Sequence, residues 1–186
     1  MINVLEIMMV LATFMYSYLI LFGKRSSFIF GIIASSITAY VLMKSGVYIQ
    51  AILYLIYILI YVYSFIRWGK NRNIKVANIS IKEIVLTCIY IITFTICIGY
   101  SFDKIGTVFP YLDAFSTACS TVAMILLSKK IIENSYVFVL SNIFSIIICF
   151  MTKEYLTILA FIIYMVFNII RVFTWNDIKK RQDLNT

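Results

Sequence analysis

Histidine is absent from this chain of 186 residues, so no imidazole is present for proton transfer or metal ligation. Glycine is scarce and no glycine-rich phosphate loop is found, which leaves ATP-driven pumping by this chain unsupported. Charged residues make up only 13%, and they do not form the convergent titratable set that a membrane-embedded hydrolase or transferase needs. The four cysteines lie in apolar runs without CxxC spacing and are interpreted as small hydrophobic residues. We therefore expect no enzyme activity, no cofactor and no bound metal.

Apolar residues, in contrast, make up 63% of the chain. A soluble domain of this length cannot bury so much apolar surface, which places the protein in a lipid bilayer. About 20 apolar residues span the hydrocarbon, so the chain has room for six or seven helices and no extramembrane domain. We predict an all-α membrane protein, a single integral membrane domain over 1–186, with spans near 3–22, 28–43, 49–67, 84–102, 113–128, 135–151 and 155–174. The first span carries Glu6 and no basic segment before it, so it is not interpreted as a cleavable signal peptide.

The net charge of +8 is distributed unevenly between the two sets of loops. Loops after odd-numbered spans, together with the C-terminal end, hold thirteen Lys and Arg, whereas the opposite loops hold three. This bias predicts a multi-pass protein of the cell inner (plasma) membrane, with its N-terminus outside and a cytoplasmic tail at 176–186. Because the basic residues are split among short loops, no nucleic-acid partner is expected.

A pattern repeats along the chain at a separation of 107 residues. Trp68 and Trp175, the only tryptophans, end matching apolar runs, and Tyr57 aligns with Tyr164 without a gap. We interpret 1–68 and 113–175 as two three-helix repeats and 84–102 as a linker helix, the parallel 3+1+3 plan of SWEET-type sugar facilitators. Such repeats favour a transporter, because they build a solute path between matching halves. The alternative is chance similarity in a biased composition, since tryptophan favours membrane interfaces.

Polar and aromatic residues form a stripe at helical spacing on the third and seventh spans. The stripe on the third span consists of Gln50, Tyr54, Tyr57, Tyr61, Ser64 and Trp68. The stripe on the seventh consists of Thr157, Phe161, Tyr164, Asn168, Arg171 and Trp175. A stripe of this kind on an aliphatic helix is expected to point away from lipid. It indicates either a solute path or helix packing through hydroxyl and amide groups.

Other polar positions fit a solute path less sharply. Asp113, Thr117 and Ser120 share a face of the fifth span, and Asp113 is equally explained as a helix cap. Asn142 on the sixth span is a candidate ligand, although buried asparagines in membrane helices are usually satisfied by neighbouring helices.

Three segments carry a resemblance to a known family. The stretch Pro110–Asn134, PYLDAFSTACSTVAMILLSKKIIEN, strongly resembles the PnuC family of nicotinamide riboside transporters. YSFIRWGK at Tyr63–Lys70 resembles a YGWxxW-type motif of that family, and KEYLTILAFIIYMVFNIIRVFTW resembles its last helix. The similarity extends from about Lys24 to Trp175.

The resemblance implies facilitated uptake of a vitamin precursor through a seven-helix core that assembles as a homotrimer, with a cytosolic kinase trapping the imported riboside. Phe65 and Trp68 match the motif's two tryptophans, Ser64 its glycine, and Asn142 a polar substrate-side position. Several positions depart from the family pattern: Phe65 replaces a tryptophan, Met124 a glutamine, and Ser135 and Phe138 tryptophans. These departures open the alternatives of thiamine, riboflavin or a deoxynucleoside as substrate.

An aromatic cation fits the residues without a partner carboxylate. The pyridinium ring of nicotinamide riboside can lie over an aromatic face, a contact worth roughly 0.5–2 kcal/mol. The predicted substrate-binding residues are Tyr57, Tyr61, Ser64, Phe65, Trp68, Thr117, Ser120, Asn142, Tyr164 and Asn168. The second hypothesis is a membrane scaffold subunit that transports nothing, and it would place the same aromatic residues in packing or at the membrane interface.

Overall fold

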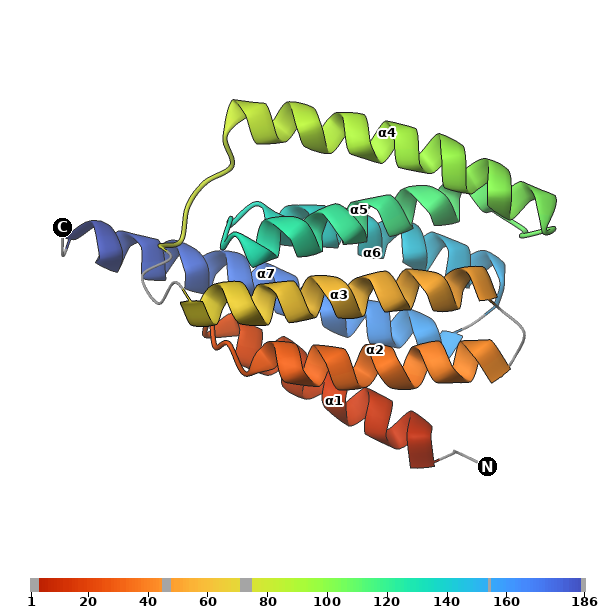
Figure 1. The fold of residues 1–186 in the computed structure, drawn as a ribbon, viewed down its shortest axis with the longest axis horizontal. Helices are drawn as coiled ribbons and strands as arrows, with labels where there is room; N and C mark the ends of the chain where they lie inside the picture. The colour runs from red at the N-terminus through yellow and green to blue at the C-terminus, as the bar shows by residue number, and fades with distance from the viewer. Residues whose placement is uncertain (1–3, 45–47, 71–74, 154, 185–186) are drawn as a thin grey trace. The chain divides into compact units, whose positions relative to one another are not determined.

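The computed structural model describes residues 4–44, 48–70, 75–153 and 155–184, which are helical over most of their length (Figure 1). The helices in these ranges are α1 Val4–Leu21, α2 Ser27–Lys44, α3 Tyr48–Lys70, α4 Ile81–Lys104, α5 Pro110–Ser128, α6 Asn134–Met151 and α7 Tyr155–Leu184. The predicted spans are thus confirmed as seven helices, and their ends agree within three residues except at α7, which continues ten residues past 174. The side chains of Gln50 and Thr157, which begin the two stripes, lie outside the described residues.

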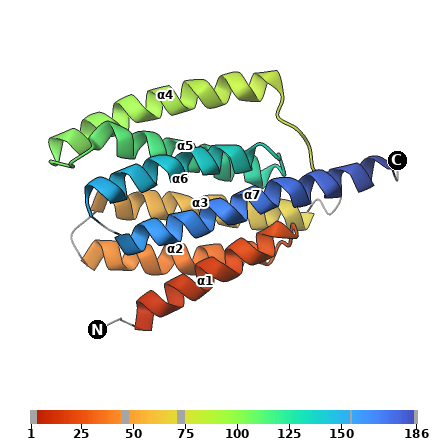
Figure 2. The same cartoon turned by 180° about the vertical axis from the view of Figure 1, so that it is seen from behind.

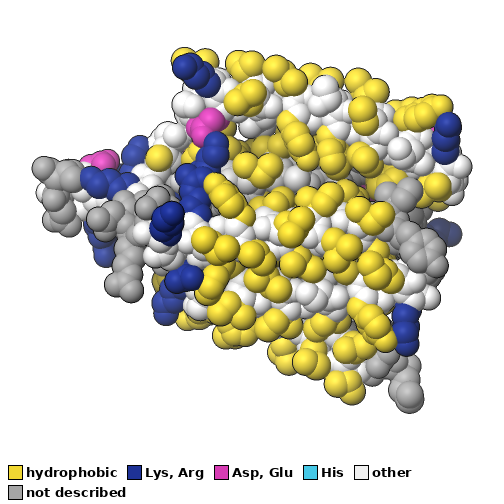
Figure 3. All heavy atoms as spheres, viewed as in Figure 1, with side chains coloured by type: hydrophobic (Ala, Val, Ile, Leu, Met, Phe, Trp, Pro, Cys, Tyr) yellow, Lys and Arg dark blue, Asp and Glu magenta, His cyan; other side chains and the backbone are white. Residues whose placement is uncertain are grey.

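The helices have the length and composition of membrane spans. Six of them, α2 to α7, contain a stretch of at least 18 residues apolar enough to cross a bilayer, while the described apolar part of α1, Ile7–Leu21, is shorter. Hydrophobic side chains cover the outward faces of the helices in Figure 3, and Lys and Arg gather at helix ends. This distribution is the one expected where lipid replaces water as the solvent.

The chain forms two compact units, Met1–Lys75 and Val76–Thr186. In the first unit, α2 packs against both α1 and α3. In the second unit, α5 packs against α4 and α6, and α6 packs against α7 (Figures 1 and 2). Helix α5 is the most buried of the second unit, whereas α4 is exposed along most of its length. The helix predicted as a linker is therefore packed on α5.

Two glycines permit close helix contacts within the units. A Cβ atom at Gly31 of α2 would lie 2.9 Å from ring atoms of Tyr61 on α3. A Cβ atom at Gly99 of α4 would lie 2.5 Å from the ring of Tyr111 on α5. Each glycine therefore lets a tyrosine ring lie directly on the facing helix backbone, which a larger residue would prevent.

Three helices end with the same backbone turn. In a Schellman motif the residue after the C-cap adopts a left-handed conformation, and the next N–H bonds back to a carbonyl five residues earlier. Gly23 after α1 has φ +62° with Lys24 N bonded to Leu19 O at 3.3 Å, and Gly106 after α4 ends its helix in the same way. Lys130 after α5 has φ 58°, with Ile131 N bonded to Leu126 O at 3.1 Å. A lysine therefore stands in a backbone conformation that favours glycine.

The segment Val76–Ser80, which we call the strap, connects to the start of α4 and is held by the turn between α5 and α6. Ala77 N donates to Lys130 O at 3.1 Å, and Ile132 N donates to Ala77 O at 3.0 Å. Ile79 N donates to the carboxylate of Glu133 at 2.9 Å. The strap thus adds a short parallel pairing to the end of the second unit.

The C-terminal part of α7 holds the strap from another side. Gln182 Oε1 accepts a hydrogen bond from Val76 N at 3.0 Å, and Lys179 bonds to the side chain of Asn78. Lys179 and Gln182 are three residues apart and share one face of the helix. The residues predicted as a tail are therefore helical up to Leu184 and bind the strap.

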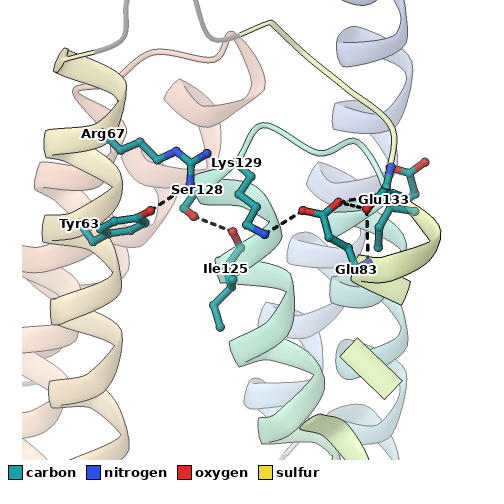
Figure 4. Close-up of polar contacts among 9 residues, drawn as sticks. Tyr63, Arg67, Glu83, Ile125, Ser128, Lys129 and Glu133 are labelled. Atoms are coloured by element: carbon teal, nitrogen blue, oxygen red, sulfur yellow. Dashed lines mark hydrogen bonds and ion pairs between the residues drawn. The ribbon is translucent and has the colours of Figure 1, made fainter. Parts of the chain in front are cut away.

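The start of α4 is fixed by a capping box and an ion pair. The hydroxyl of Ser80 accepts a hydrogen bond from Glu83 N, and the Glu83 carboxylate accepts one from Ser80 N. Lys129 at the end of α5 reaches the same carboxylate at 2.8 Å, as Figure 4 shows. The entry of α4 is thereby fixed to the end of α5.

Candidate functional site

The stripe on α3 lies away from the exposed face of the helix, as predicted. Ser64 and Trp68 are buried, and Tyr57, Tyr61 and Phe65 are half-buried. The exposed large apolar residues of α3 are Ile52, Leu55, Ile56, Leu59, Val62, Tyr63 and Ile66. The predicted residues of the first unit are therefore not on the side of α3 that is most open to lipid.

Aromatic contacts bring part of this stripe together in the first unit. The ring of Phe28 on α2 lies 4.8 Å from Trp68 and 6.3 Å from Tyr61, measured between ring centroids. Tyr61 also meets Tyr16 of α1 at 5.2 Å. Phe28, Tyr61 and Trp68 therefore form an aromatic cluster, and Tyr57 instead packs against Tyr54 of its own helix at 5.6 Å.

Phe65 already has a cation over its ring. The guanidinium carbon of Arg25 lies 3.8 Å from the ring centroid, and Arg25 Nε donates to the Phe65 carbonyl at 2.7 Å. Gly69 makes room for this side chain, because a Cβ atom there would lie 2.3 Å from the Arg25 guanidinium. Ser64, the neighbouring predicted residue, donates its hydroxyl hydrogen to Ile60 O at 2.7 Å.

The predicted hydroxyl residues of α5 are half-buried. Ser120 Oγ donates to the Thr117 carbonyl at 2.9 Å, and Thr121 donates to the same carbonyl at 2.8 Å. Backbone carbonyls of the helix commonly satisfy hydroxyl groups in this way.

The two predicted asparagines of the second unit differ in their hydrogen bonding. Asn142 of α6 is 7% exposed, and its Nδ2 has no hydrogen-bond partner among the described residues. Asn168 of α7 is 8% exposed, and its Nδ2 donates to the Tyr164 carbonyl at 2.9 Å. A buried amide without a partner is costly, so Asn142 retains an N–H available to a ligand.

A buried arginine completes the polar surface of α7. Arg171 is 4% exposed, its Nε donates to Ser135 Oγ of α6 at 2.9 Å, and its terminal nitrogen donates to Asn168 Oδ1. Its guanidinium carbon lies 5.3 Å from the ring centroid of Phe138 and 6.0 Å from that of Trp175. The structure therefore brings Tyr164, Asn168 and Arg171 together and joins them to the start of α6.

Arg171 was predicted only as a member of the stripe and as a loop charge. The sequence nevertheless contains a signal that it is a candidate functional residue. It follows Asn168 by three residues and precedes Trp175 by four, which places all three on one helix face. Ionisable residues in membrane helices are functional candidates because their burial is expensive.

Three serines form a cluster at the contact between α5 and α6, of which Ser141 and Ser145 are one turn apart in the sequence and Ser116 was not predicted. Ser116 Oγ lies 2.8 Å from Ser145 Oγ and 3.2 Å from Ser141 Oγ, and the Ser141 hydroxyl donates to the Ser116 carbonyl at 2.8 Å. Such bonds join helices where no water competes. In the described part of the chain, no three His, Cys, Asp or Glu side chains gather in a way that could hold a metal.

Comparisons with known proteins support the resemblance found in the motifs. A family model described as nicotinamide mononucleotide transporter matches residues 3–177. No curated protein matches the chain in sequence. A solved structure described as "Crystal structure of the Vitamin B3 transporter PnuC" is similar with a TM-score of 0.74 and 19% identity, covering 94% of this chain and 81% of that chain.

This likeness shows the fold that the two chains share. The predicted resemblance to the PnuC family is confirmed by the family model together with this structure. Both matches are to transporters and not to enzymes, and the apolar helices are those of a multi-pass membrane protein. The chain belongs to the nicotinamide mononucleotide transporter family.

Proposed function

We propose that this protein takes up a vitamin B3-related solute, nicotinamide riboside or a close analogue, by facilitated diffusion. The match of the transporter family model over residues 3–177 carries this proposal. The chemistry of the two stripes supports it, because tyrosine rings on α3 suit an aromatic cation and the asparagines near α7 suit ribose or carboxamide groups.

The proposed architecture is two three-helix repeats joined by α4. Helix bounds support it: shifting α2, Ser27–Lys44, by 107 residues gives 134–151, the bounds of α6. The same shift takes the start of α3 to that of α7, and takes Gly23 to Lys130, the two left-handed turns that follow α1 and α5. Equivalent helix ends at one constant separation are expected of a repeated unit.

Facilitated diffusion is favoured by the placement of acidic groups. Proton or sodium coupling ordinarily uses carboxylates deep within the spans. Glu83 lies near the start of α4 and is paired with Lys129 at 2.8 Å, and Asp113 lies in the first turn of α5. A facilitator needs a binding site and two access states only.

Three further features belong to the same proposal. The N-terminus lies outside the plasma membrane and the C-terminus in the cytoplasm, following the thirteen-to-three bias of basic residues. The protein assembles as a homotrimer, and a cytosolic kinase that phosphorylates the imported riboside keeps it inside the cell.

Purified protein in liposomes tests the function directly. Radiolabelled nicotinamide riboside is expected to equilibrate inward without ATP or an ion gradient, and nicotinamide mononucleotide, thiamine, riboflavin and a deoxynucleoside are compared beside it. Preferred uptake of thiamine, riboflavin or the deoxynucleoside would identify that compound as the solute in place of nicotinamide riboside. A requirement for an imposed gradient would reject facilitated diffusion, and no uptake of any compound would favour a scaffold role.

Two substitutions test the site. Tyr57→Ala and Asn142→Ala are expected to reduce uptake roughly tenfold, because each removes a contact of about 1–2 kcal/mol with the solute. Tyr18→Ala is the matched control, since Tyr18 is 47% exposed on α1. Wild-type uptake in both site variants, at equal protein level, would reject the site.

A further inference from the structure

Equivalent positions of the two proposed repeats differ in chemistry, apart from Trp68 and Trp175. In the first unit, Phe28 contacts Trp68 and Tyr61 through aromatic rings. Shifted by 107 residues, these positions hold Ser135, Trp175 and Asn168, and the position of Ser64 holds Arg171. In the second unit, Ser135, Asn168 and Arg171 form a hydrogen-bonded cluster in place of the rings. We call these three residues the polar cluster.

Packing alone does not account for the polar cluster. In the first unit the positions equivalent to Ser135 and Asn168 hold the aromatic residues Phe28 and Tyr61, and the position of Arg171 holds the neutral Ser64, so no charged group is buried there. A guanidinium that is 4% exposed requires several partners to offset the loss of its hydration. An ionisable group buried in a membrane helix is expensive and is therefore a candidate for a functional role.

The Arg171 side chain determines which atoms Asn168 presents. A guanidinium only donates hydrogen bonds, so the atom of Asn168 that faces it is the oxygen Oδ1. The amide nitrogen then faces the other way and donates one of its two hydrogens to the Tyr164 carbonyl. Asn168 therefore has Oδ1 held by Arg171 and one of its two N–H groups on the Tyr164 carbonyl, and the described residues show no bond from the other N–H.

We propose that Arg171 is a positioning residue that fixes the Asn168 amide with its N–H directed away from Arg171 and toward the solute, so that this part of the site selects solutes by a hydrogen-bond acceptor. The inference rests on the proposed function and names the group that is recognised, an amide or carboxylate oxygen. Asn142 on the adjoining helix α6 also presents an N–H, since its Nδ2 lacks a partner. Two such donors, one on α6 and one on α7, suit a group that only accepts hydrogen bonds, so a carboxylate fits them at least as well as a carboxamide.

Ligand-induced thermal shift and liposome uptake test this selection with a pair of probes. Nicotinamide riboside carries a carboxamide, and nicotinic acid riboside carries a carboxylate on the same ring. The wild-type protein is expected to bind the two within about threefold of each other. In Asn168→Asp the side chain still accepts from Arg171 but donates nothing, so binding of the carboxylate probe relative to the carboxamide probe is expected to fall at least tenfold.

Arg171 variants separate positioning from packing. In Arg171→Met the Asn168 amide is free to turn. The affinity for the carboxylate probe is then expected to fall about three- to tenfold relative to that for the carboxamide probe. Arg171→Lys keeps a donor beside Oδ1 and is expected to restore the ratio in part. An unchanged ratio in Arg171→Met, even with weaker binding of both probes, would show that Arg171 only packs.

Failure of the inference and failure of the proposed function give different results. Binding of both probes without uptake would reject transport and leave the selection standing, because the ratio is measured by binding. Should Arg171→Met not fold, Asn168→Asp decides, since it keeps the oxygen that Arg171 contacts. A wild-type protein that rejects the carboxylate probe more than tenfold, or that binds neither probe, overturns the inference.

Discussion

Lys130 is a residue whose backbone and side chain both oppose folding. Its φ of 58° is a left-handed conformation that costs an ordinary residue roughly 1 kcal/mol more than glycine. Burial also lowers the pKa of its amine, so the charged form is disfavoured in the folded state. The penalty is complete below the lowered pKa of the folded state, shrinks as pH rises from there to the ordinary pKa of lysine, and is absent above it, where the amine is neutral in both states.

Lys130→Gly is therefore expected to stabilise the protein by about 1 kcal/mol, seen as roughly 2–4 °C in thermal unfolding at neutral pH. Lys130→Met removes the charge and keeps the backbone cost, so it is expected to give a smaller gain. The equivalent Gly23→Ala is the opposite control, since it creates the left-handed penalty at φ +62°. A loss of stability in Lys130→Gly would mean that contacts of the side chain outweigh both terms.

Individual site residues could be predicted only in part. The burial of Trp68 and Asn168 followed from helical periodicity, which depends on spacing alone. The hydrogen-bond partners of each polar side chain could not be predicted from spacing, because they come from other helices. Arg171, for example, reaches Ser135 at a separation of 36 residues, which no local pattern indicates.

At the scale of elements, the helices were predictable and their extramembrane connections were not. Apolar runs set the spans, and the polar residues after Trp175 predicted the end of the last one. Helix α7 nevertheless continues to Leu184. Its last turns are held by Val76 and Asn78, more than 100 residues away in sequence, so the reason for the longer helix lies in tertiary contacts.

The strap gives a prediction at this scale. Val76 is 7% exposed, and Gln182 provides the oxygen that accepts from its N–H. Gln182→Ala leaves a buried donor unpaired and is expected to cost about 1–3 kcal/mol in thermal unfolding. Gln182→Glu keeps an oxygen and is expected to cost less, and Lys180→Ala, on an exposed neighbour, serves as the control. Equal stability of Gln182→Ala and the control would show that the C-terminal turns do not secure the strap.

At the scale of the whole molecule, composition and charge placement predict the most, because each depends on many residues. The apolar fraction of 63% predicted an all-helical membrane protein, and single substitutions scarcely change that quantity. The resemblance to the family was most specific in Pro110–Asn134, which contains the buried helix α5, and the family model matches residues 3–177.

Orientation in the membrane is a further property of the whole chain, and the bias of thirteen basic residues to three predicts it. A fluorescent protein fused after Thr186 is expected to be bright in cells, and alkaline phosphatase fused there to be inactive, since the C-terminus is cytoplasmic. Phosphatase inserted after Lys104 is expected to be active. Replacing Lys24 and Arg25 with alanine leaves eleven basic residues against three, so both reporters are expected to keep their signals. Active phosphatase at the C-terminus of the unaltered chain would show that the topology is the reverse of the predicted one. Uptake would then begin at the opposite end of every helix.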